Sequence, residues 1–217
     1  MKIARFTSAL LLAALVGSAQ AGPTLLSEGF DDVGTLAASG WVYQALSGPV
    51  ALPNAGWFQG DNTSEFTAQS GPDSSYIASN FLASSPTGFI DTLLITPFFS
   101  LESDVTLTFW ARTDNLGFSD SFAVLAGTTA GPGGEAVSQV LADTVAVGDW
   151  TQYTVQLAGQ GAGATGRFAF EYFGSVDTSN YIGFDTVTVT AVPEPETYAL
   201  MGLGLAALAL RRRKSAA

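Results

Sequence analysis

Residues 104–112 read DVTLTFWAR, and this stretch decides the fold. Read as an extended chain, it places four apolar side chains on one face: Val105, Leu107, Phe109 and Ala111. The opposite face carries Thr106, Thr108 and Trp110. A period of two is typical of a strand that packs one face on a core and turns the other toward solvent. The stretch therefore predicts a half-buried β-strand.

The same alternation recurs along the body of the chain. It is clearest in TQYTVQL (151–157) and RFAFEYF (167–173). Shorter strand candidates are SYIASNF (75–81), LLITPFF (93–99), SFAVLAG (121–127) and IGFDTVTVT (182–190). No comparable window places apolar residues at helical spacing, and clusters of Gly, Pro, Asn and Asp separate the candidates. Seven or more short antiparallel strands with long loops predict an all-β domain at 22–191, built as a two-sheet β-sandwich.

One of the separating clusters also has an approximate phosphate-binding pattern. AGQGAGATG (158–166) contains G-x-G-x-x-G, but it lies between two predicted strands, without a following helix or a P-loop lysine. We therefore interpret it as a hairpin connection.

Composition and charge exclude several classes of function. The 217 residues include no Cys and no His, which removes thiol chemistry, the usual general base and the commonest transition-metal ligand. Between Gly22 and Val192 only Arg112 and Arg167 are cationic, against 17 acidic residues, so this body carries a net charge of −15. Such a body repels phosphate backbones, so we expect no nucleic-acid partner.

The N-terminus has the three parts of a secretory signal peptide. Residues 1–21 read MKIARFTSALLLAALVGSAQA, with cations at the start, an apolar stretch, and small residues Ala19 and Ala21 around Gln20. This order predicts export and cleavage after Ala21. The competing interpretation is a first buried helix.

The C-terminus, 192–217, combines three further features. It begins with VPEP at 192–195, whose prolines cannot continue a strand ladder. Residues 198–210 carry no charge, and a basic tail follows at 211–214. A helix of this length covers about 20 Å, against a hydrocarbon core of roughly 30 Å. We therefore expect a short transmembrane helix that tethers the chain transiently; a helix docked on the domain is the alternative, although the run has no polar face.

This arrangement resembles the PEP-CTERM sorting signal of Gram-negative bacteria. The residues that carry the resemblance are Val192, Pro193, Glu194, Pro195, Arg211, Arg212 and Arg213. The resemblance implies that a membrane-embedded exosortase recognises the motif and removes the tail. It also implies transient tethering in the inner membrane, then a place on the cell envelope surface or in the extracellular, exopolysaccharide-rich biofilm matrix.

The order of motifs in the body resembles the choice-of-anchor J domains, relatives of the cleaved-adhesin and MAM-like jelly rolls. That order runs SEGFDDV, GW, WFQGD, SYIASNF, LLITP, LTFWART, GDWTQYTVQL, GRFAFEYF and YIGFDTVTV. The chain departs from the common pattern just before LLITP, where Thr92 stands in place of a Trp. The resemblance implies a jelly-roll-like sandwich and no particular reaction.

Three acidic residues form a candidate metal site. Glu28 lies on the expected first strand, Asp31 follows it, and Asp185 lies on the expected last strand. First and last strands of jelly rolls are often neighbours, and a set of carboxylate and carbonyl oxygens suits Ca²⁺. The competing interpretation is that these residues cap turns and strand ends, because no D-x-D-x-D-G loop is present.

A second candidate is glycan binding by WFQGDN. Trp57 and Phe58 offer aromatic planes for sugar rings, while Gln59, Asp61 and Asn62 offer partners for hydroxyl groups. The competing interpretation is that these aromatics fill the core, as most Trp residues in sandwiches do.

Together these features favour an exported, non-enzymatic surface or matrix protein that binds glycan, with exopolysaccharide as partner and calcium as support. Two alternatives stay open. A secreted carbohydrate-active hydrolase would use paired carboxylates, although chance pairs are expected among so many acids and no G-x-S-x-G motif occurs. A protein–protein adhesion module would use exposed edge strands or an apolar patch.

Overall fold

The computed structural model of the chain describes residues 22–46, 53–61, 66–127, 138–193, 201–206 and 211–212. The expectations for 1–21, Asn62, Glu194, Pro195 and Arg213 lie outside these residues. The chain divides into two units, of which the larger contains strands β1–β12. In the smaller unit, residues 201–206 and 211–212 are helical. Within the described residues no helix has the length and apolar character of a membrane span, and the predicted helix at 198–210 lies partly outside them.

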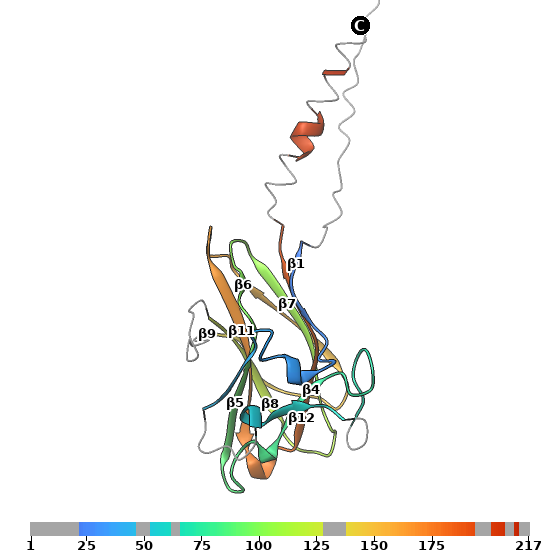
Figure 1. Cartoon of the computed structure of the whole chain (residues 1–217), viewed down its shortest axis with the longest axis vertical. Coiled ribbons are helices and arrows are strands. Elements are labelled where there is room, and N and C mark those ends of the chain that lie inside the picture. Colours follow the sequence, from blue (N-terminus) through green and yellow to red (C-terminus); the bar gives the residue numbers. More distant parts are fainter. Residues whose placement is uncertain are drawn as a thin grey trace, which may run out of the picture. The chain divides into compact units, whose positions relative to one another are not determined.

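The larger unit consists of two antiparallel sheets packed face to face (Figure 1). Sheet A has the order β10 (Thr151–Leu157), β7 (Val105–Thr113), β12 (Tyr181–Ala191), β4 (Ile77–Asn80) and β3 (Trp57–Gln59). One side of β12 pairs with β7. The other side pairs first with β4 and then with β1 (Thr24–Glu28). The predicted pairing of the first and last strands is therefore confirmed.

Sheet B has the order β2 (Val42–Ala45), β5 (Phe89–Ile95), β11 (Thr165–Ser175), β8 (Ser121–Gly127) and β9 (Ser138–Val145). The short β6 (Phe99–Ser100) pairs with the start of β11, on the same side of β11 as β5. Four 3₁₀ turns connect strands: η1 (Val33–Thr35), η2 (Pro53–Gly56), η3 (Phe81–Ala83) and η4 (Val176–Thr178).

The core lies between the sheets and is rich in aromatic rings. Phe109 and Phe184 from sheet A meet Phe122 and Phe170 from sheet B, with ring centroids of Phe109 and Phe170 4.9 Å apart. All four side chains are fully buried. Replacing a buried Phe by Ala costs about 3–5 kcal/mol, so this cluster is a main source of cohesion between the sheets.

The predicted all-β, two-sheet sandwich is confirmed. In β7 the apolar positions of DVTLTFWAR are buried, and the intervening positions are half-buried. The hairpin predicted for 158–166 is wrong, because these residues join β10 in sheet A to β11 in sheet B. Both strands pair with neighbours inside their own sheets, so the glycines span the edge of the sandwich.

Candidate ligand-binding pocket

A pocket of about 640 Å³ opens beside β3, an edge strand of sheet A, between turns η1 and η2. Its wall is formed by Asp32, Val33, Gly34, Pro53, Asn54, Gly56, Trp57, Phe58, Gln59 and Asn80. Three of the five residues predicted to bind glycan therefore lie on one pocket wall: Trp57, Phe58 and Gln59. Asp61 is exposed and is not part of this wall.

Turn η2 forms one side of the pocket in a strained conformation. Asn54, Ala55 and Gly56 follow one another with φ angles of 53°, 54° and 88°. The left-handed region is costly for Ala, so the surrounding structure must hold it. It does so through two hydroxyl groups: Thr92 Oγ1 donates to the Ala55 carbonyl at 2.6 Å, and Ser79 Oγ donates to the Gly56 carbonyl at 3.0 Å. Both sheets thus hold the backbone of the turn that presents Asn54.

Gln59 holds the opposite wall in place. Its Oε1 accepts a hydrogen bond from Val33 N at 2.8 Å, and its Nε2 donates to the Phe30 carbonyl at 2.8 Å. Asp32 caps η1 by accepting a hydrogen bond from Gly34 N at 2.9 Å. The Gln59 amide is therefore engaged with the backbone, and its role is to position η1 against β3.

The two aromatic residues of β3 point to opposite faces of the strand. Trp57 is 1 % exposed and packs on Phe184, with ring centroids 5.8 Å apart. Its Nε1 is buried and has no hydrogen-bond partner in the described part of the chain. Phe58 is half-buried and packs edge-on against Tyr181 at 5.8 Å. Trp57 is thus mainly a core residue that also lines the pocket, and not an exposed platform.

The chemistry of the pocket wall is that of a binding site for a polar, uncharged or cationic molecule. Besides the Gln59 amide, which the backbone engages, it combines one carboxylate (Asp32) and two further primary amides (Asn54 and Asn80) with the apolar surfaces of Val33, Trp57 and Phe58. Apolar walls with a few fixed polar groups are the usual composition of small-molecule sites. Glycoside cleavage needs two carboxyl groups, whereas the described wall contributes one.

The three acids predicted to bind calcium each have protein partners. Asp185 is fully buried, and its Oδ2 accepts hydrogen bonds from Gln69 N at 2.8 Å and Ser70 N at 3.1 Å. Asp31 Oδ1 accepts one from Ser75 Oγ at 2.6 Å, and Glu28 Oε1 accepts one from Phe30 N at 2.8 Å. Among the residues that the structure describes, no three Asp or Glu side chains gather as a metal-binding group.

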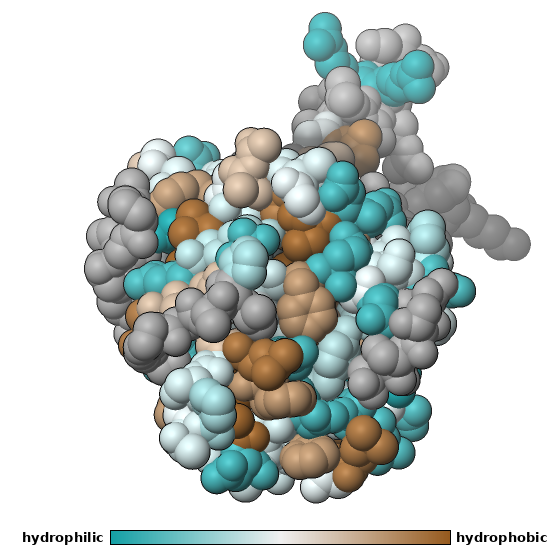
Figure 2. Space-filling view, turned by 60° about the horizontal axis from the view of Figure 1, so that its bottom comes forward, coloured by the Kyte–Doolittle hydropathy of each residue, from teal (hydrophilic) through white to brown (hydrophobic). Residues whose placement is uncertain are grey.

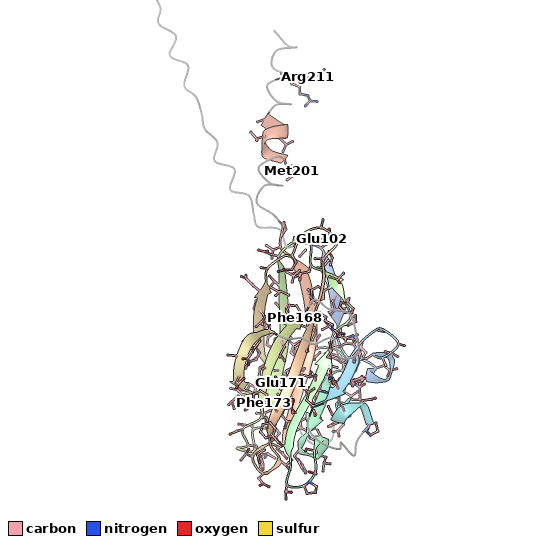
Figure 3. The ribbon with its side chains drawn as sticks, turned by 90° about the vertical axis from the view of Figure 1, so that its left-hand side faces the viewer. Glu102, Phe168, Glu171, Phe173, Met201 and Arg211 are labelled. Atoms are coloured by element: carbon pink, nitrogen blue, oxygen red, sulfur yellow. The ribbon has the colours of Figure 1, made fainter. Side chains whose placement is uncertain are left out.

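A pair of carboxyl groups that sequence reasoning missed lies on sheet B. Asp91 on β5 and Glu171 on β11 form a side-chain hydrogen bond. Glu171, labelled in Figure 3, alternates along β11 with the core residues Phe170 and Tyr172. Burial, followed by the charge of Asp91, raises the pKa of Glu171 to about 7. Only the register of β5 against β11 brings the two residues together, so no local motif marks them.

Comparison with known proteins identifies the C-terminal signal. Residues 191–214 match the PEP-CTERM protein-sorting motif. The match includes every predicted sorting residue from Val192 to Arg213. The chain therefore carries a sorting signal that indicates export, processing at the membrane by an exosortase, and a surface or extracellular location. No curated protein matches the sequence significantly.

Solved structures with the same fold include adhesin domains of Lys-gingipain (Kgp) from Porphyromonas gingivalis W83. The K1 cleaved adhesin domain shares 24% identity with a TM-score of 0.55, over 78% of this chain and 99% of that chain. The K3 domain also shares 24% identity, with a TM-score of 0.52, over 78% of this chain and 100% of that chain. The body thus has the jelly-roll-like sandwich fold of cleaved adhesin domains.

Proposed function

We propose that the chain is an exported, non-enzymatic protein of the cell surface or extracellular matrix whose β-sandwich binds glycan. The observation that carries the proposal is the pocket between η1 and η2. Its walls bring a carboxylate, two amides and two aromatic residues around one space of about 640 Å³. Sugars present hydroxyl groups and apolar C–H faces, and such a wall matches both.

The strain in η2 supports a binding role for the same pocket. Residues held in sparsely populated backbone conformations concentrate at functional sites. Asn54 occupies the left-handed region on the pocket wall, and neighbouring carbonyls are tied to β4 and β5. A turn whose backbone is held in this way loses less conformational entropy when it binds a ligand than a flexible one does.

The test is binding of the full-length chain to a glycan array and to exopolysaccharide from the producing cells. Asn54→Gly removes the amide while keeping a residue that tolerates a φ of 53°. We expect affinity to fall about fivefold, the effect of losing one hydrogen-bonding group. Asn115→Gly is the matched control, because Asn115 has a φ of 64° and lies on an exposed loop away from the pocket wall. Equal affinity of both variants and the wild type would contradict the proposal.

Calcium support is a separate part of the proposal and depends on Glu28, Asp31 and Asp185. Ca²⁺ binding at these residues would require their side chains to turn from their present hydrogen-bond partners. Saturating calcium then raises the melting temperature of the EDTA-treated protein. An unchanged melting temperature would remove calcium from the proposal and leave the glycan pocket untouched.

The hydrolase alternative finds little support in the acid pair on sheet B. Asp91 and Glu171 are hydrogen-bonded to each other. Retaining glycosidases hold their carboxyl groups about 5 Å apart, and inverting enzymes hold them farther apart to admit a water. A directly bonded pair leaves no room for a sugar between its members.

Adhesion to another protein is a second candidate, favoured by one end of the domain. Here η3, η4 and residues 114–119 are linked by backbone hydrogen bonds, from Phe81 N to the Asn180 carbonyl and from Ser119 N to the Thr178 carbonyl. Large apolar side chains are 37–65 % exposed in this region: Phe81, Leu82, Phe89, Leu116 and Phe118. Figure 2 shows hydrophobic side chains at this end, interrupted by polar ones. Self-association seen as concentration-dependent sedimentation, and abolished by Leu116→Ser, would support adhesion between copies of this chain.

A further inference from the structure

The charge of the pocket wall limits which glycans it can hold. Its described residues include the carboxylate of Asp32 and no Lys or Arg. One oxygen of Asp32 accepts the bond from Gly34 N, and the other has no hydrogen-bond partner among the described residues. Because Asp32 is exposed, that oxygen is open to a donor on a ligand.

The body offers no free cation to balance an acidic ligand elsewhere. Its two arginines are engaged in other places. Arg112 donates to the Gly148 carbonyl and lies 4.2 Å from the centre of the Phe66 ring. Arg167 is 3 % exposed and lies 4.8 Å from the centre of the Phe98 ring. With 17 acidic residues in the same body, the field around the domain repels carboxylated or sulfated sugars and attracts ammonium groups.

We infer, on the basis of the proposed glycan-binding function, that the pocket prefers sugars bearing a free amine over their N-acetylated or acidic counterparts. The ammonium group would donate to the open oxygen of Asp32. Asn54 supplies a further amide oxygen on the same wall. Asn80 Oδ1 already accepts a hydrogen bond from Leu82 N at 3.0 Å and keeps one lone pair for a second donor. An ammonium group carries three donors and no acceptor, so a wall of oxygens satisfies it, whereas an acidic sugar would face the carboxylate unpaired.

The test compares three oligosaccharides of equal length: a β-1,4-linked glucosamine hexamer, the N-acetylglucosamine hexamer and a galacturonate hexamer. Binding is measured by calorimetry on the full-length chain in a polyoxyethylene detergent, which has no sugar headgroup. The buffer is slightly acidic, so that the sugar amines are protonated, and contains physiological salt and EDTA. We expect the glucosamine hexamer to bind about fivefold more tightly than its N-acetylated form, the size of one partly exposed charge pair, and the galacturonate hexamer not to bind.

Two isosteric variants separate a specific contact from general attraction. Asp32→Asn keeps a residue that can cap η1 and removes the charge, and it should abolish the preference for the amine. Asp143→Asn removes the same charge from β9, an edge strand of sheet B that does not line the pocket. This variant should retain the preference.

The outcomes distinguish the inference from the proposed function. Equal or tighter binding of the N-acetylated hexamer would overturn the inference while leaving glycan binding intact. The same would follow if Asp143→Asn weakened the preference as much as Asp32→Asn did. If none of the three hexamers bound, and the glycan array were also negative, the proposed function itself would fail.

Discussion

Asp185 shows how one buried acid organises a loop over sheet A. It pairs with Trp110 of β7 and stands directly before a bulge in β12, after which the pairing resumes at Thr188. Its carboxylate accepts hydrogen bonds from Gln69 N and Ser70 N and from Thr186 N, which belongs to the next residue. Burial raises the pKa of Asp185, and these hydrogen bonds act in the opposite direction. The residue therefore fixes segment 69–70.

Asp185→Ala should consequently destabilise the domain. It leaves three backbone N–H groups without their acceptor, and unsatisfied donors cost about 1–3 kcal/mol when buried. Because Ser70 is exposed, its N–H group can donate to water instead. We therefore expect the free energy of unfolding to fall by about 2 kcal/mol in total, measured by urea denaturation at neutral pH. Asp73→Ala, an exposed acid in the same loop region, serves as control. A loss no larger than that of the control would show that the carboxylate does not organise the loop.

At the pocket, sequence reasoning could find the location and not the roles. WFQ at 57–59 drew attention because aromatic and amide residues adjoin there, and all three residues line the pocket. Their roles depend on strand direction, which turns Trp57 into the core, and on the distant backbone groups that occupy Gln59. Asn54 and Asn80 could not be predicted, because their position requires the left-handed turn of η2 and the register of β3 against β4.

Among the elements, β5 and β11 bring two partly buried carboxyl groups together. Their register places Asp91 opposite Phe173 and Glu171 opposite Leu93, so the two carboxyl groups are diagonal neighbours. Burial raises the pKa of both, and that of Glu171 reaches about 7. A carboxyl group with a raised pKa holds its proton better in the folded than in the unfolded state. Its stabilising effect is therefore complete below the unfolded pKa and is lost as pH rises toward about 7.

Glu171→Gln should flatten the pH dependence of stability between about pH 4.5 and 7. Because the group is half-buried, solvent screening reduces the effect to on the order of 1 kcal/mol. Above pH 7 the variant should be more stable than the wild type, measured by urea denaturation at several pH values. Glu102→Gln removes an exposed acid and accounts for the general loss of negative charge. Parallel pH profiles of the wild type and Glu171→Gln would refute the assignment.

The predictability of each strand follows from what covers it. β7 could be predicted because its apolar positions are buried and its intervening residues are only half-buried, which preserves a period of two. β9 was missed because its residues SQVLADTV form an edge strand that is exposed or half-buried throughout, so no face needs to be apolar. β4 and β8 are buried on both faces over most of their length. Their apolar runs therefore predict a strand, but they do not predict which face of it points into the core.

At the scale of the molecule, the fold closes through its two ends. β1 pairs with β12, and Ala191 N donates to the Pro23 carbonyl at 3.0 Å. Val192 N, in the first residue of VPEP, donates to the Asp104 carbonyl at 2.7 Å. The folded domain therefore extends to the sorting motif without a spacer, and the last strand is complete before the motif begins.

This closure predicts that residues 22–193 fold without either terminal segment, whereas a chain ending at residue 180 does not. The shorter chain lacks β12, which joins β7, β4 and β1 and carries the core residue Phe184. We expect the 22–193 chain to give a β-rich circular dichroism spectrum and one cooperative thermal transition, within about 2 °C of that of the full-length protein. The chain ending at residue 180 should show no cooperative transition. A markedly lower melting temperature for 22–193 would mean that the tail stabilises the domain, and removal of the tail at the membrane would then weaken the exported form.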